Sequence, residues 1–254
     1  MNVEIRQEML PSKNPIQVTE TTVAFLGTEV KKGPGGDLVP KAEQFAGQPL
    51  TEFDFRLMKD IAIGLALNQP VLIQGGSGLG KSQTVDRMCH ILGANSYSVN
   101  CHNVELDALV GKFSTDENSK SGFGWKDGTV MQAVRNGGIL FLDEYNFMRG
   151  DVRAGLHQVL DSILRGTEQI VLTDNHGEVV PVHPEFRLIV AQNQPGNKNT
   201  DREVLDPAQY TRFVPINLPD DLPKEVKKAR ALGYIGIDND IKICLLYTSP
   251  SPRD

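Results

Sequence analysis

Gly75-Gly76-Ser77-Gly78-Leu79-Gly80-Lys81-Ser82 is the stretch of sequence that decides the fold, because it fits the pattern G-x-x-x-x-G-K-[ST] at every position. An apolar run at residues 71–73 precedes it, and a segment with helical character at residues 83–92 follows it. A strand, a glycine-rich turn and a helix start together form an anion cradle. Backbone N–H groups point inward, and the helix terminus adds about half a positive charge. The pattern therefore predicts a nucleoside triphosphate site.

Two side chains of this loop have predicted roles. Lys81 is expected to reach the outer phosphates, and Ser82 is expected to hold Mg²⁺. The full set of predicted nucleotide-binding residues is Gly75, Gly76, Ser77, Gly78, Leu79, Gly80, Lys81, Ser82 and Gln83.

Length and composition are those of an ordinary soluble globular protein, with 254 residues, 39% apolar and 23% charged. No apolar run approaches the ~20 residues that span a bilayer, and the N-terminus lacks a basic-then-apolar pattern. We therefore expect no membrane contact and a cytoplasmic location. The net charge of −6, without a Lys/Arg block, argues against a nucleic-acid surface but leaves a local basic pore open.

The chain has three cysteines, too few for a disulfide framework. Cys89-His90 and Cys101-His102 resemble a metal pair at first sight. Their spacing fits no standard zinc pattern, and Cys89 falls on the helix expected after the phosphate loop. We interpret these residues as structural.

Apolar runs alternate with helical patterns along residues 51–218, which predicts a parallel α/β sheet sandwiched by helices. Strands are expected at 71–73, 96–100, 139–142, 186–191 and 213–218, and helices at 51–67, 83–92, 105–109 and 152–164. Two insertions interrupt the alternation. Residues 112–128 are polar and glycine-rich, and residues 169–182 read as a hairpin around a polar turn. Residues 21–26 form one further strand-like run before a turn at 31–37.

Asp143 and Glu144 end the apolar run at 139–142, and ligands of open α/β sheets bind at the carboxyl ends of strands. Asp143 is predicted to coordinate Mg²⁺, mostly through water, and Glu144 to act as the general base. The alternative is a helix N-cap, which these residue types also favour.

Asn193 follows the strand expected at 186–191, where its amide can bind the attacking water or the γ-phosphate. An Asx turn before Pro195 is the alternative. Arg212 precedes the last expected strand, and a guanidinium there can neutralise charge on a transferring phosphoryl group. Spacing alone favours a surface ion pair for Arg212.

Taken in order, these segments resemble the AAA+ ATPases of the MoxR and dynein-related branch, close to the CbbQ/NorQ type. The segments are LDALVG at 106–111, FGWKDGTVMQAVR at 123–135, GGILFLDEYN at 137–146, VHPEFRLIVAQN at 182–193 and LDPAQYTRF at 205–213. They resemble, in turn, the stretch after the second strand, the helix-2 insert, Walker B, the pre-sensor hairpin with sensor 1, and the arginine-finger segment. The resemblance covers residues 51–219.

The resemblance implies a P-loop NTPase core with a helix-2 insert and a pre-sensor hairpin. It implies that Arg212 acts on the ATP of the neighbouring subunit, in a homo-oligomeric ring usually of six. It also implies chaperone-like remodelling, often with a von Willebrand factor A-domain partner. A non-catalytic ATP-dependent assembly switch and a DNA-directed motor subunit stay open as alternatives.

The resemblance divides the chain into a lead-in segment at 1–50, the ATPase core at 51–219 and the start of a helical lid at 220–243. By the resemblance, we expect most of that lid, with its sensor 2 arginine, to lie beyond the given sequence. Residues 244–254 resemble the translation of a sequencing adaptor, so we expect an artefact there, with a short disordered tail as the alternative. Hydrolysis by this exact chain is therefore in question.

Overall fold

A parallel sheet forms the centre of the computed structural model, which describes residues 14–115, 122–193 and 210–234. The sheet has five strands in the order β12-β4-β11-β8-β5. They are β4 (Val71–Gln74), β5 (Ser96–Asn100), β8 (Gly138–Asp143), β11 (Phe186–Gln192) and β12 (Val214–Asn217). The five strands expected from the sequence are confirmed, and so is the α/β class.

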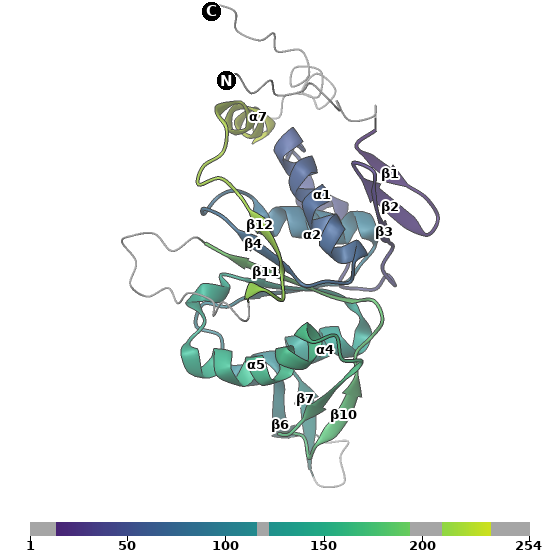
Figure 1. The fold of residues 1–254 in the computed structure, drawn as a ribbon, viewed down its shortest axis with the longest axis vertical. Helices are drawn as coiled ribbons and strands as arrows, with labels where there is room; N and C mark the ends of the chain where they lie inside the picture. Colours follow the sequence, from purple (N-terminus) through teal and green to yellow (C-terminus); the bar gives the residue numbers. More distant parts are fainter. Residues whose placement is uncertain (1–13, 116–121, 194–209, 235–254) are drawn as a thin grey trace, which may run out of the picture.

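Helices cover both faces of this sheet (Figure 1). One face carries α1 (Glu52–Ala66) and α2 (Lys81–Leu92), and the other carries α4 (Thr129–Asn136) and α5 (Gly150–Leu164). Short helical turns lie elsewhere along the chain, namely η1 (Ala42–Phe45) before α1, α3 (Leu106–Leu109) after β5 and η2 (Tyr145–Phe147) between β8 and α5. The helix expected at 105–109 is thus a single turn.

Strand residues alternate between two hydrophobic cores, because successive side chains of a strand point to opposite faces. Ile139 and Phe141 pack with α1 and α2, whereas Leu140 and Leu142 pack with α4 and α5. All four side chains are at most 2% exposed. The continuous apolar run therefore has the burial on both faces that a central parallel strand requires.

Both insertions are antiparallel hairpins, and they lie together beyond α4 and α5 (Figure 1). β9 (Gln169–Leu172) pairs with β10 (Glu178–Pro181), which confirms the expected hairpin. β6 (Gly111–Thr115) pairs with β7 (Phe123–Asp127), which the sequence analysis did not predict. The rings of Phe113 and His176, 5.1 Å apart, join the two hairpins.

Between residue 14 and the core the structure has three short strands, where the sequence predicted one. β2 (Thr22–Phe25) lies between β1 (Ile16–Val18) and β3 (Thr28–Lys31) in an antiparallel sheet. Leu26 and Gly27 connect β2 to β3 with φ values of 46° and 86°, as a two-residue type I′ turn requires. The neighbours of β2 escaped detection because each has only three or four residues and little apolar periodicity.

The part of the chain that is described after β12, as far as residue 234, contains one helix. α7 (Lys224–Tyr234) lies beside α1 at the top of Figure 1. The expected lid segment is therefore described as far as residue 234, and the artefact expected at 244–254 lies outside the described residues. None of the helices within the described ranges combines the length and apolar character that crossing a bilayer requires.

Candidate active site

The phosphate loop connects β4 to α2 and has the conformation that its glycines allow. Gly78 and Gly80 adopt φ values of 77° and 84°, which side chains rarely tolerate. A Cβ on Gly76 would lie 2.4 Å from the carbonyl oxygen of Asp220. The chain after β12 thus passes directly over the loop, and only glycine leaves room for it.

Lys81 is the first residue of α2, and its ammonium group folds back over the loop. Nζ donates to the carbonyl oxygens of Gly75 at 2.9 Å and Gly76 at 2.8 Å. It also donates to Oδ1 of Asn193 at 2.9 Å. Lys81 is 6% exposed, so a buried cation stands at the mouth of an anion cradle. The N-cap residue of α2 is Gly80, which has no side chain to cap the first N–H groups of the helix. These N–H groups can therefore bind an anion.

Ser82 and Asp143 meet across the same edge of the sheet, as the sequence predicted. The Ser82 hydroxyl donates to Oδ2 of Asp143. Hydroxyl and carboxylate oxygens are the hard ligands that Mg²⁺ takes, with water and phosphate oxygens completing the shell. Within the described ranges no three His, Cys, Asp or Glu side chains cluster as a self-sufficient metal site. The pair therefore fits a cation that arrives with a nucleotide.

Glu144 follows directly and has a left-handed backbone, with φ of 54°. Its backbone N–H donates to Oδ1 of Asp143 at 2.9 Å, so the Asp143 carboxylate is oriented by the backbone of its neighbour. The conformation is uncommon for a non-glycine residue and is a feature of functional sites. Glu144 occupies the N-cap position of the short turn η2, but its side chain makes no capping bond there.

Asn193 stands at the carboxyl end of β11, beside Lys81. It is 8% exposed, and its carbonyl oxygen accepts from Nδ2 of Asn146 at 3.0 Å. Asn146 itself is 3% exposed. The sequence analysis assigned no role to Asn146, although it lies three residues after Asp143. Its contact with Asn193 links the Walker B segment to β11.

Arg212 is the one predicted site residue that lies away from the others. It precedes Val214, which pairs with Val71 at the start of β4, whereas the phosphate loop follows the end of that strand. The Arg212 guanidinium pairs with Oδ1 of Asp161 on α5, and it lowers the pKa of that carboxyl. Within one chain, Arg212 therefore forms an ion pair, as the spacing alone favoured.

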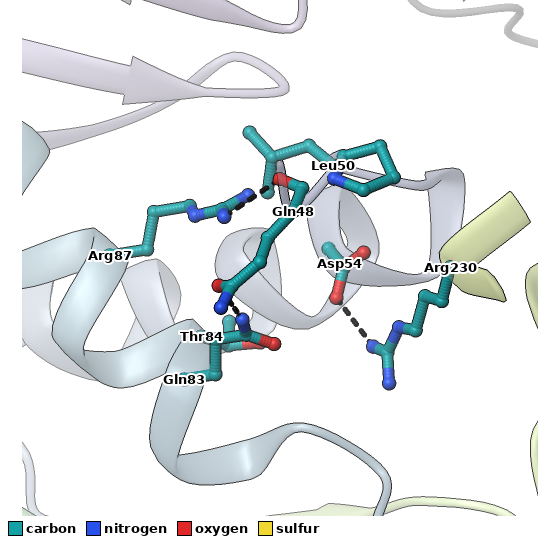
Figure 2. Close-up of a pocket in the computed structure, with 8 residues that line it drawn as sticks. Gln48, Leu50, Asp54, Gln83, Thr84, Arg87 and Arg230 are labelled. Atoms are coloured by element: carbon teal, nitrogen blue, oxygen red, sulfur yellow. Dashed lines mark hydrogen bonds and ion pairs between the residues drawn. The ribbon is translucent and has the colours of Figure 1, made fainter. Parts of the chain in front are cut away.

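A pocket adjoins the phosphate loop on the α1 and α2 side of the sheet (Figure 2). Gln83 and Arg87 of α2 face Gln48, and Arg230 of α7 faces Asp54 of α1. Arg87 donates to the carbonyl oxygen of Gln48 at 2.9 Å. The sequence predicted only Gln83 here. The lining residues are Gln48, Pro49, Leu50, Asp54, Gln83, Thr84, Arg87 and Arg230.

Cys89 and Cys101 are fully buried free thiols. Burial raises the pKa of each to about 12, and for Cys101 the carboxylates of Asp143 and Glu144 add to the effect. The Cys101 N–H donates to the carbonyl oxygen of Asp143 at 2.9 Å, so this residue supports the carboxylate strand end. The structural interpretation agrees with this burial.

A parallel sheet with a glycine-rich loop, an invading lysine and a Ser–Asp pair at one edge defines a P-loop NTPase core of the AAA+ type. The family model of the AAA domain (dynein-related subfamily) matches residues 70–213, more than half of the chain. The chain therefore belongs to the dynein-related subfamily of AAA domains. The MoxR and dynein-related assignment made from the sequence is confirmed.

Relatives and a solved structure agree with this family. The chain is 34% identical over 166 residues to the denitrification regulatory protein NirQ of Stutzerimonas stutzeri, covering 65% of this chain and 56% of NirQ. It is 33% identical over 174 residues to protein NorQ of Paracoccus denitrificans, covering 67% of this chain and 60% of NorQ.

A candidate ATPase from Cytophaga hutchinsonii, solved as a crystal structure, shares the fold with a TM-score of 0.51 and 21% identity. The structural match covers 74% of this chain and 51% of the Cytophaga hutchinsonii chain. The chain thus spans between half and three fifths of the length of these three proteins.

Proposed function

We propose that this protein is an ATP-hydrolysing motor of the AAA+ class that remodels a partner protein. ATP with Mg²⁺ binds at Gly75–Gln83, and Ser82 and Asp143 hold the metal ion. Bound Mg²⁺ supplies charge neutralisation on the phosphate oxygens. Glu144 takes a proton from a water whose oxygen bonds to the γ-phosphorus, the bond from the γ-phosphorus to the β–γ bridging oxygen breaks, and ADP and phosphate leave.

One observation carries the proposal, namely the convergence of four polar side chains at one sheet edge, with Glu144 next to them in the chain. Ser82 contacts Asp143, and Lys81 contacts Asn193 at 2.9 Å. The backbone of Glu144 is fixed against Asp143. A lysine, a hydroxyl, two carboxylates and an amide are together the groups that bind a triphosphate, its metal ion and a water.

Arg212 is proposed to act on the ATP of a neighbouring subunit, in a ring of six. Its position supports this role. Val214 pairs with Val71, and Gly75 begins four residues later, so Arg212 is about 13 Å or more from its own loop at roughly 3.3 Å per strand residue. Arg212 cannot span that distance within its own chain, which supports its action on the ATP of a second copy.

The task of the motor is proposed to be chaperone-like remodelling, with a von Willebrand factor A-domain protein as a partner. NirQ is named as a regulatory protein, which is consistent with action on another protein. The two hairpins offer a surface for such contact, because Phe113 and Phe123 are 44% and 60% exposed and Val171 and Val179 are 57% and 53% exposed. Exposed apolar groups gathered in this way mark interaction sites.

Phosphate release by the parent and by Glu144→Gln tests the mechanism. The variant should bind ATP as the parent does and lose at least about a hundredfold in turnover, the range for loss of general-base catalysis. Glu168→Gln, on the exposed end of the loop after α5, is the matched control and should leave turnover unchanged. Equal turnover in Glu144→Gln and the parent would refute the role of Glu144.

The same assay separates the alternative functions. Stoichiometric ATP binding with assembly, but without phosphate release from the parent, would favour the assembly switch. Stimulation of turnover by DNA would favour the DNA-directed motor, against which the net charge of −6 argues.

A further inference from the structure

We propose that Arg230 is a positioning residue that ties helix α7 to the phosphate loop and thereby sets the affinity for the nucleotide. This inference rests on the proposed function. Arg230 lies on α7, after the last strand of the sheet, yet its guanidinium reaches both the loop and the start of α1 (Figure 2).

The contacts of Arg230 join three parts of the chain. Nη2 donates to Oδ1 of Asp54 at 2.8 Å and to the carbonyl oxygen of Leu79 at 3.2 Å. The guanidinium carbon lies 6.0 Å from the centre of the Phe53 ring. A Cβ on Gly80 would lie 2.9 Å from Nη2, so the guanidinium packs directly against the loop. We call this set of contacts the α7 latch.

Asp54 is fixed independently of Arg230, which makes it a firm anchor. Its Oδ2 accepts from the backbone N–H of Thr51 at 2.8 Å and from the Thr51 hydroxyl at 2.6 Å, in a capping box at the start of α1. The side chains of Arg230 and Asp54 are 17% and 7% exposed. A buried, hydrogen-bonded ion pair of this kind holds its partners in one geometry, and breaking it leaves a buried charge.

The latch and a bound nucleotide use different atoms. Arg230 takes the carbonyl oxygen of Leu79, whereas a phosphate loop binds anions through its N–H groups. The latch therefore leaves phosphate binding possible and restrains the loop that performs it. Since Arg230 also lines the adjoining pocket with Gln83 and Thr84, α7 closes one side of the site when the latch is made.

A restrained loop loses less conformational freedom when the nucleotide binds, so loss of the latch should weaken binding. The charge of Arg230 is paired with that of Asp54, so the latch acts by restraining the loop. It acts on affinity rather than on the bond-breaking step, because the hydrogen bonds of Arg230 go to Asp54 and Leu79 and not to Glu144 or Asp143.

The test is a titration of the full chain with a fluorescent ATP analogue and Mg²⁺, at a temperature where every variant is folded. Arg230→Gln should raise Kd roughly tenfold, within the usual range of coupling between sites. Asp54→Asn should also raise Kd roughly tenfold. Its amide oxygen can still accept from Thr51, whereas its NH2 group would face Arg230 and cannot accept the hydrogen bond. The double variant should bind no more weakly than the worse single variant, since both remove one contact.

Lys227→Gln is the matched control. Lys227 lies one turn earlier on α7 and pairs with exposed Asp221, so its loss should leave Kd within about twofold, as expected for an exposed pair. Hydrogen exchange of residues 224–234 gives a second readout. Nucleotide should slow exchange there in the parent and in Lys227→Gln, and not in Arg230→Gln.

The outcomes separate the latch from the proposed function. A parent that fails to bind the analogue refutes the nucleotide site itself. A parent that binds, with Arg230→Gln binding equally well, overturns the latch and leaves the nucleotide site standing. A lower unfolding temperature with unchanged Kd also overturns it, because the contact would then be structural only. Additive effects of Arg230→Gln and Asp54→Asn on log Kd would show that the two residues act separately, against the proposal.

Discussion

Mixing two inactive variants should restore ATP turnover, because Glu144 and Arg212 are predicted to act on one ATP from different subunits. Glu144→Gln keeps the arginine and loses the base, and Arg212→Ala does the opposite. The register of the sheet sets how far Arg212 lies from the phosphate loop of its own chain. Val214 pairs with Val71 at the strand end opposite the loop, so Arg212 is at least about 13 Å from its own phosphate site at roughly 3.3 Å per residue.

In a random ring with equal amounts of both variants, an interface is complete when the Arg212→Ala subunit contributes Glu144 and its neighbour contributes Arg212. Half of the subunits qualify on each side, so about a quarter of the interfaces are complete, given cyclic head-to-tail assembly. Turnover should therefore approach a quarter of the parent rate at equal ratio. It should fall on either side of that ratio as the product of the two fractions.

The assay is phosphate release after the two variants are mixed and exchanged at several ratios. A double variant, Glu144→Gln with Arg212→Ala, mixed with Glu144→Gln is the control, because no interface in that mixture contains the base. The preparation must first be shown to exchange subunits. If turnover at every ratio then equals the sum of the two separate variants, the action of Arg212 in trans is refuted.

Three further predictions concern single residues. Asp161→Asn frees the Arg212 guanidinium from its partner on α5. The turnover number should therefore fall several-fold with KM unchanged, and an unaltered turnover number would show that Asp161 does not position Arg212. Gly64→Ala should lower the free energy of unfolding by about 1–3 kcal/mol, as overpacking does, because its Cβ would lie 2.3 Å from Cγ2 of buried Val71. Urea denaturation measures this change, and a variant more stable than the parent would contradict the packing. Burial raises the pKa of Cys101 from 9.0 to about 12, so its contribution to stability is complete below pH 9 and is lost as the pH rises toward 12. Between pH 8 and pH 10, the fall in unfolding free energy measured by urea denaturation should be smaller in Cys101→Ala by about 1.4 kcal/mol in total. Equal falls in the two proteins would exclude the shift.

Local sequence determined the features that depend on neighbouring residues. The phosphate loop could be predicted because its glycines, lysine and serine are contiguous and the backbone itself forms the cradle. The buried strands β8 and β11 could be predicted because a parallel strand covered on both faces needs a continuous apolar run. The β9–β10 hairpin followed from two β-prone runs separated by a polar turn. The placement of Asp143 and Asn193 at one edge followed from the common direction of parallel strands.

Tertiary structure alone decided the contacts between segments far apart in the sequence. Asn146 contacts Asn193 across 47 residues, and Arg230 contacts Asp54 across 176 residues. No periodicity encodes such a pair, because each side chain is an unremarkable polar residue until the fold closes the chain between them. The β6–β7 hairpin was missed for a related reason. Both of its faces are partly exposed, so its residues lack the apolar alternation that marks a half-buried strand. Sequence thus determined the chemistry of the phosphate site, whereas packing of distant segments decided which residues hold that site in place.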